Sequence, residues 1–322
     1  MKMKRVTKIV LAIIVLLMVA FVVFRTPDTD PAAMREKYGG PPSQFVEIST
    51  GATVHLRDEG PRDALPIILL HGSNADLHTW DKWAEALKGQ FRVIRFDQVG
   101  HGLTGADPQG DYSVEGYVDD IDAVADKLEL DRFVLAGNSM GGGHTVAYAI
   151  RHPRRLAGMV LVDAGGAPIA KRGGGNLAFK LAAMPGIGNV MSQLLPRSLV
   201  EKSLSQSVSN QAVVTPEAVD RYWELARYPG NRTATRIRFG RGWHPFEEKD
   251  VAAITVPTLI LWGKEDKLIP FEAGRWYDRT LPSSTLIGYE GIGHLPQEET
   301  AAKSADDLRR WLVSLPLSSE AT

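Results

Sequence analysis

The sequence contains no cysteine, and this absence removes several kinds of site at once. Without a thiol, the chain has no disulfide bond, no thiolate metal site and no cysteine nucleophile. No Cys/His cluster with metal-ligand spacing occurs in the sequence either, so we expect no metal ion.

Net charge is nearly absent as well, with a formal value of −1 at pH 7 over 322 residues. A chain without a basic surplus gives no general case for nucleic-acid binding. The glycines form neither a P-loop nor a dinucleotide-binding loop, so we expect no cofactor. What the chain does have is 44% hydrophobic content, enough for one large core or two modest cores.

The most informative motif is Gly137-Asn138-Ser139-Met140-Gly141. An apolar, β-rich stretch at 132–136 precedes it, and a helical stretch begins near Gly142. This pattern is typical of a nucleophile elbow, in which a tight strand-to-helix turn presents a serine at the end of a sheet. A serine hydroxyl is a weak nucleophile until a base takes its proton, so the chain should also supply that base.

Two later loops supply a base and an acid in the order that this elbow requires. Asp266 follows a strand predicted at 258–262, and His294 follows a strand predicted at 284–289. Loops at the carboxyl ends of parallel strands share one rim of a sheet. We therefore expect Ser139, Asp266 and His294 to form a catalytic triad, with His294 as base and Asp266 as its orienting carboxylate.

Asp163 is an alternative acid, because it follows a strand predicted at 158–162 and reaches the same rim. We expect it to cap loop backbone or to support the hinge of a cap, and we expect Asp266 to orient the histidine.

Acyl transfer also needs donors for the oxygen that becomes negative. The backbone N–H after the nucleophile, that of Met140, is the first candidate. The second should come from the loop after a strand predicted at 66–70, where we expect the N–H of Ser73, with Asn74 as a substitute. His71 in this loop is expected to be structural.

Together these motifs resemble the α/β-hydrolase superfamily over about residues 44–315, in its serine-nucleophile, esterase- or lipase-like branch. The alternation of strands and helices predicts an α/β fold with a mostly parallel sheet and helices on both faces. The resemblance implies an eight-stranded type of sheet and a helical cap over the active site. The matching segments are His71-Gly72-Ser73, Asp97-Gln98-Val99-Gly100-His101-Gly102, the elbow, Asp266 and Gly293-His294.

Ser139 argues against haloalkane dehalogenases and epoxide hydrolases, which carry Asp at the nucleophile position. The elbow and His-Gly-Ser are similar to carbon–carbon bond hydrolases of aromatic-ring degradation. Those usually continue with Gly-Pro-Gly and place Trp after the catalytic histidine, where this chain has Asn74-Ala75-Asp76 and Leu295. We therefore expect hydrolysis of a small-molecule carboxylic ester with an apolar acyl group. Carbon–carbon hydrolysis and a non-catalytic binding module are the alternatives.

The first 25 residues form a separate unit, basic over 1–8 and apolar over 9–24. As a helix the apolar run spans about 24 Å, slightly less than the hydrocarbon core of a bilayer. We favour an uncleaved single-pass anchor over a cleaved signal peptide, since no small-x-small cleavage site precedes Arg25. The positive-inside rule then places the catalytic domain on the extracytoplasmic, periplasmic side.

The rest of the chain divides into a tether (26–43), a core (44–166 and 250–316) and a helical cap (167–249). The cap carries 12 Lys and Arg against 6 Asp and Glu. This surplus indicates either a solvated surface or a face toward anionic lipid or an anionic substrate. Four arginines gather near the end of the cap: Arg232, Arg236, Arg238 and Arg241.

Candidates for the lining of the substrate pocket come from the cap and from loops at the rim. They are Asn74, His78, Trp80, Leu181, Trp223, Trp243 and Leu295. The membrane, through the N-terminal helix, is the other expected partner, and no pattern in the sequence indicates an oligomeric state.

Overall fold

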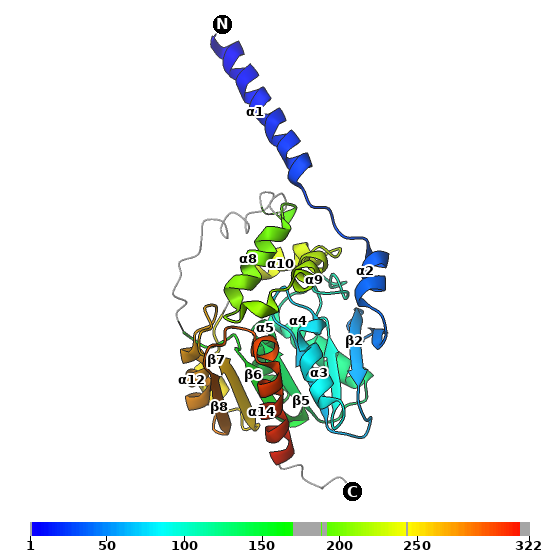
Figure 1. Cartoon of the computed structure of the whole chain (residues 1–322), viewed down its shortest axis with the longest axis vertical. Coiled ribbons are helices and arrows are strands. Elements are labelled where there is room, and N and C mark those ends of the chain that lie inside the picture. Colours follow the sequence, from blue (N-terminus) through cyan, green and yellow to red (C-terminus); the bar gives the residue numbers. More distant parts are fainter. Residues whose placement is uncertain (1, 170–187, 189–191, 243, 316–322) are drawn as a thin grey trace.

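An eight-stranded sheet in the order β1-β2-β4-β3-β5-β6-β7-β8 forms the centre of the molecule. The structure is a computed structural model that describes residues 2–169, 188, 192–242 and 244–315 (Figure 1). Strands β3 to β8 run parallel, and β2 pairs antiparallel with both β1 and β4. The predicted α/β class with a mostly parallel eight-stranded sheet is confirmed. The strands are β1 (Ser43–Glu47), β2 (Thr53–Glu59), β3 (Pro66–Leu70), β4 (Arg92–Phe96), β5 (Phe133–Asn138), β6 (Leu156–Val162), β7 (Thr258–Gly263) and β8 (Ser284–Tyr289).

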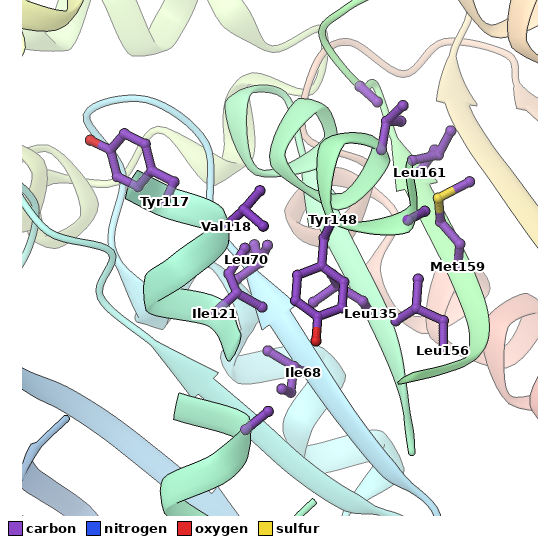
Figure 2. Close-up of a cluster of buried hydrophobic side chains, with 14 of the residues drawn as sticks. Ile68, Leu70, Tyr117, Val118, Ile121, Leu135, Tyr148, Leu156, Met159 and Leu161 are labelled. Carbon is purple, nitrogen blue, oxygen red and sulfur yellow. The ribbon is translucent and has the colours of Figure 1, made fainter. Parts of the chain in front are cut away.

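Helices cover both faces of the sheet, because alternate residues of the apolar strands point to opposite sides. Ile68 and Leu70 of β3 pack with helices α4 (Val114–Lys127), α5 (Met140–Arg151) and α12 (Phe271–Thr280). Figure 2 shows Tyr148 and Ile121 within this cluster.

The neighbouring residues Ile67 and Leu69 pack instead with α3 (Asp81–Leu87) and α14 (Ala301–Ser314) on the other face. These two helices lie side by side in Figure 1. Each buried strand therefore serves two hydrophobic cores.

The insertion between β6 and β7 contains no strand among its described residues. Its helices gather at one end of the molecule, above the carboxyl ends of the strands (Figure 1). They are α8 (Arg197–Ser207), α9 (Pro216–Ala226) and α10 (Asn231–Arg241), whereas α11 (Glu248–Ala252) packs against α12 and α5. The exact cap limits, 167 and 249, stay a prediction. Elsewhere the chain forms α13 (Pro296–Glu299) and three short 3-10 helices, η1 (Leu77–Trp80), η2 (Pro153–Arg155) and η3 (Gln211–Val213).

The N-terminal helix α1 (Lys2–Phe24) projects away from the rest of the molecule, at the end where α8, α9 and α10 lie (Figure 1). Its segment Val6–Phe24 has a mean hydropathy of 3.0 over 19 residues, and none of it is buried. The helix is long and apolar enough to cross a membrane, a property that it shares with signal sequences.

The segment predicted to be a tether is folded against the cap over residues 26–38, which we call the strap. Helix α2 (Pro31–Tyr38) lies within it, and Asp30 caps this helix by accepting the N–H groups of Ala32 and Ala33 at 2.8 and 2.9 Å. The prediction of a linker was wrong because Asp followed by Pro also marks the start of a helix.

Arg232 of α10 fastens the strap to the cap. Its Nη1 donates to the carbonyl of Thr26 at 2.7 Å and to that of Ser192 at 3.1 Å. Its Nη2 binds the carboxylate of Asp28. The side chain is 8% exposed, so a buried cation holds the start of the strap. Further contacts between the strap and α9 are Arg227–Pro27, Thr29–Glu224, Lys37–Glu224 and Tyr38–Glu224.

We expect Arg232→Met to destabilise the protein by about 1–3 kcal/mol, because buried acceptors lose a charged donor. Thermal unfolding of the full chain in detergent measures this loss. Arg241→Met is the matched control on the same helix, since Arg241 pairs with Asp111 at the surface, where ion pairs contribute about 0–1 kcal/mol. Equal melting temperatures for the two variants would contradict the proposed fastening.

Candidate active site

Ser139 lies in the sharp turn between β5 and α5, with φ 54° and ψ −114°. A non-glycine residue in this conformation is strained, and such strain gathers at functional sites. A Cβ atom at Gly137 would lie 2.2 Å from the carbonyl oxygen of Gly141, and one at Gly141 would lie 2.4 Å from that of Leu70. The two glycines are therefore required by the close approach of strand and helix, and the turn leaves Ser139 half-buried.

His294 and Asp266 meet at the same rim of the sheet. The Nδ1 atom of His294 lies 2.7 Å from Oδ2 of Asp266, and both residues are buried. The other carboxylate oxygen accepts the N–H groups of Leu268 and Ile269 at 2.7 and 3.0 Å, which fixes its position. A carboxylate at Nδ1 favours the tautomer with its proton there, so that Nε2 is the nitrogen able to accept a proton.

Asn138 connects this pair to the elbow. Its side-chain amide donates to the carbonyl oxygen of His294 at 3.1 Å and to that of Val162 at 3.1 Å. The histidine loop thus lies beside the residue that precedes Ser139. Within the described residues, no hydrogen bond of ordinary length joins Ser139 Oγ to His294, a bond that in ligand-free sites is often long and tightens with substrate.

Asp163 lies next to this pair without contacting the imidazole in the orienting position. It is buried, has φ 45°, and accepts the N–H of Gly263 at 3.0 Å. Burial, and then the negative charge of Asp266, raises the pKa of Asp163 well above its ordinary value. The raised pKa favours the protonated form of Asp163, and the geometry favours Asp266 as the orienting carboxylate of His294.

The ligand atoms of Asp163, Asp266 and His294 lie within 4.8 Å of one another, close enough to surround a cation. However, Nδ1 of His294 is already bonded to Asp266, and the raised pKa of Asp163 disfavours the deprotonated carboxylate that metal binding needs. The arrangement suits proton transfer better than metal binding.

The loop after β3 reaches the elbow, as an oxyanion hole requires. A Cβ atom at Gly72 would lie 3.1 Å from Cβ of Ser139. Met140 is the first residue of α5, so its N–H has no acceptor within the helix. Ser73 and Met140 are both half-buried, and their roles as donors stay a prediction. Asn74 is exposed, with φ 60°.

The sequence analysis missed the place of Arg238, which enters the site from the cap. Its Nη1 lies 3.0 Å from Oγ of Ser73 and 2.9 Å from Sδ of Met140. Arg232 fastens the strap and Arg241 pairs with Asp111 at 3.3 Å. These three arginines therefore do not form one lipid-facing cluster, because their partners lie in different places.

Glu299 is a second residue that sequence reasoning missed. Its buried carboxylate accepts the N–H groups of Ser209 and Asn210 from the cap at 2.8 and 2.9 Å. It also accepts those of Gly293 and Leu295, on either side of His294, at 3.1 Å each. One carboxylate thus joins the cap to the histidine loop, and no local sequence signal marks it.

Two predicted pocket residues lie away from the nucleophile. Trp80 is fully buried in the core beneath α3, with its ring 4.9 Å from that of Trp83, because the 3-10 turn η1 points it inward. His78 binds the carboxylate of Asp76 at 2.7 Å. It lines a cavity of about 540 Å³ whose other lining residues, such as Tyr38, come mainly from the strap and the cap.

Two further residues predicted to line the pocket, Trp223 and Leu295, have structural contacts in the cap. The indole of Trp223 donates to the carbonyl of Leu195 at 2.7 Å and stacks against Arg227. Leu295 is buried with Leu204 and neighbouring apolar residues of the cap. These two side chains hold the cap together and to the core. Leu181 and Trp243 lie outside the described residues.

Comparison with known proteins identifies the family. A family model described as alpha/beta hydrolase fold matches residues 66–301. The chain belongs to this family. The resemblance that the motifs indicated is therefore confirmed.

Similar proteins have different activities. A 2-hydroxy-6-oxo-2,4-heptadienoate hydrolase of Pseudomonas putida is 30% identical over 257 residues, 78% of this chain and 90% of that protein. A thermophilic esterase from Thermogutta terrifontis has 27% identity and a TM-score of 0.71, over 84% of this chain and 99% of that one. A membrane phospholipase A has the same fold at 22% identity and a TM-score of 0.74, over 97% of this chain and 100% of that one.

We expect Asp266→Asn to lower kcat by about 10⁴-fold, as the loss of the orienting acid does in other triads. Asp163→Asn should keep most of the activity, because an amide resembles the protonated carboxyl group that the raised pKa of Asp163 favours. Steady-state hydrolysis of a nitrophenyl ester measures both. A larger loss for Asp163→Asn would reverse the two assignments.

Stability against pH tests the state of Asp163 independently. Its raised pKa means that the unfolded chain loses this proton first, so the stability of the wild type falls as pH rises from about 4 toward the folded pKa. Asp163→Asn removes this pH dependence. The melting temperature of the variant, relative to that of the wild type, should therefore rise between pH 4 and pH 7. A difference that stays constant over this range would mean that Asp163 is ionised in the folded protein.

Proposed function

We propose that this protein is a membrane-anchored serine hydrolase that cleaves carboxylic esters through an acyl-enzyme. The observation that carries the proposal is the pair His294–Asp266, 2.7 Å apart, beside a strained serine in a nucleophile elbow. A buried imidazole held by a carboxylate next to such a serine has the components of acyl transfer.

In the proposed reaction, Ser139 Oγ attacks the ester carbonyl while Nε2 of His294 takes its proton. The N–H groups of Ser73 and Met140 stabilise the oxygen that becomes negative. His294 then gives its proton to the leaving alcohol, which departs and leaves an acyl group on Ser139. A water molecule, deprotonated by the same imidazole, releases the acid and restores the serine.

The position of α1 supports a substrate that comes from the membrane or partitions into it. The helix is long and apolar enough to span a bilayer, and the strap ties it directly to the cap. We propose an uncleaved anchor that holds the cap at the membrane, with the catalytic domain on the extracytoplasmic side because the basic residues precede the helix. Esters with apolar acyl chains fit this location best.

Carbon–carbon hydrolysis is the second candidate, and the Pseudomonas putida relative favours it. Its named substrate contains no ester bond, so its hydrolysis must break a carbon–carbon bond. Parallel assays of a nitrophenyl ester and a vinylogous diketone distinguish the two: the ester proposal requires turnover of the former and fails if only the diketone reacts.

We expect Ser139→Ala to abolish both ester hydrolysis and labelling by a fluorophosphonate probe, because no other group replaces the nucleophile. Among nitrophenyl esters of two to twelve carbons, kcat/KM should rise with acyl length. The assays should use the full chain in detergent or a chain that begins at Thr26, which keeps the contacts of Arg232 to the strap. Failure of the folded wild type to label would favour a non-catalytic binding module.

A further inference from the structure

Arg238 is a cation in the candidate active site, and it has no anionic partner among the described residues. Its guanidinium donates to the hydroxyl of Ser73, the sulfur of Met140 and the hydroxyl of Thr235, at 3.0, 2.9 and 3.1 Å. Thioether sulfur is a weak acceptor. In the part of the chain that the structure describes, no carboxylate lies within ion-pair distance of it, and its buried Nε has no hydrogen-bond partner.

The rest of the cap cannot supply the missing charge. Residues 170–187, 189–191 and 243 of the cap lie outside the described residues, and none of them is Asp or Glu. The only acidic residue outside the described part is Glu320, near the C-terminus.

The surroundings of Arg238 are neutral. Three histidines whose side chains are fully or almost fully buried lie nearby: His71, His101 and His144. Burial lowers the pKa of each, and for His101 and His144 the charge of Arg238 is the next largest cause. Tyr112 and Tyr117 face the same cation, and burial raises the pKa of both phenols. A half-buried guanidinium is thus surrounded by uncharged groups, and burial lowers its own pKa.

A lone cation in such a place is costly unless an anion joins it. The side chain is half-buried, as are Ser73, Ser139 and Met140, so solvent reaches all four. The two residues that Nη1 contacts are the two expected to donate to the oxyanion. An anion bound to this guanidinium would therefore lie close to the reacting carbonyl.

We propose that Arg238 binds an anionic group of the substrate, a carboxylate or a phosphate, carried a few atoms from the scissile carbonyl. This inference rests on the proposed function and narrows it to anionic esters. The planar fork of arginine matches both kinds of oxyanion. On binding, the anion replaces the weakly accepting sulfur of Met140 as a partner of Nη1.

The test compares two nitrophenyl esters of equal chain length, the neutral butyrate and the succinate monoester with its free carboxylate. For Arg238→Gln we expect kcat/KM on the succinate ester to fall about 10- to 100-fold, mainly through KM, since a charged hydrogen bond is lost. Hydrolysis of the butyrate should change little. Arg238→Lys should recover part of the loss, and Arg241→Gln, with its surface pair to Asp111, is the control that should leave both esters unchanged.

A second pair of substrates identifies the anion: a short monoacylglycerol and its 3-phosphate. If phosphate is the natural group, the Arg238→Gln loss is larger on the phosphate ester than on the succinate ester, and the reverse holds for a carboxylate. An equal loss on neutral and anionic esters would overturn the proposal, because Arg238 would then act on cap structure or on the oxyanion itself.

Binding to the inactive Ser139→Ala protein separates this inference from the proposed hydrolase function. Succinate or inorganic phosphate should raise the melting temperature of Ser139→Ala and leave that of Ser139→Ala/Arg238→Gln unchanged. Anion binding that depends on Arg238 would support the subsite even if no ester is turned over. If the wild type hydrolyses the butyrate but anion binding does not depend on Arg238, the anion subsite is rejected and the proposed hydrolase function stands.

Discussion

The site depends on one steric constraint, the approach of β5, α5 and β3 to distances that no side chain allows. Carbonyl oxygens occupy the places where side chains at Gly137 and Gly141 would begin. This contact forces Ser139 into a left-handed backbone conformation and directs it out of the sheet. It also starts α5 at Met140, whose N–H is then free to point at the same place. The proposed nucleophile and the proposed oxyanion donor are thus two results of one packing arrangement.

The cap takes part in holding the base. The backbone N–H of His294 donates to the carbonyl of Ser207 at the end of α8, and Glu299 binds backbone of both the cap and the histidine loop. The imidazole therefore depends on two supports, Asp266 from the core and the end of α8 from the cap. A change that moves α8 should therefore also move the imidazole of His294, the proposed base.

Much of this organisation could be predicted from local patterns. The elbow, the two loops after β7 and β8, and the parallel sheet each have a short sequence signature, and rim residues converge because parallel strands end together. The roles of Arg238, Glu299 and Arg232 could not be predicted, since each depends on contacts between segments distant in the chain. Trp80 was misassigned because a helix-start position does not reveal which face a 3-10 turn buries. The helix in the strap was not predicted because a high content of Pro, Gly and Asp is typical of linkers.

The strap has a mechanical consequence. Only one residue, Arg25, separates the end of α1 at Phe24 from Thr26, whose carbonyl is bound by Arg232 of the cap. Such a short connection transmits displacement in both directions. Outward movement of the cap must either drag the hydrophobic helix through its surroundings or break the bonds of Arg232. In the membrane-anchored form that we propose, bilayer thickness and tension would therefore act directly on the cap.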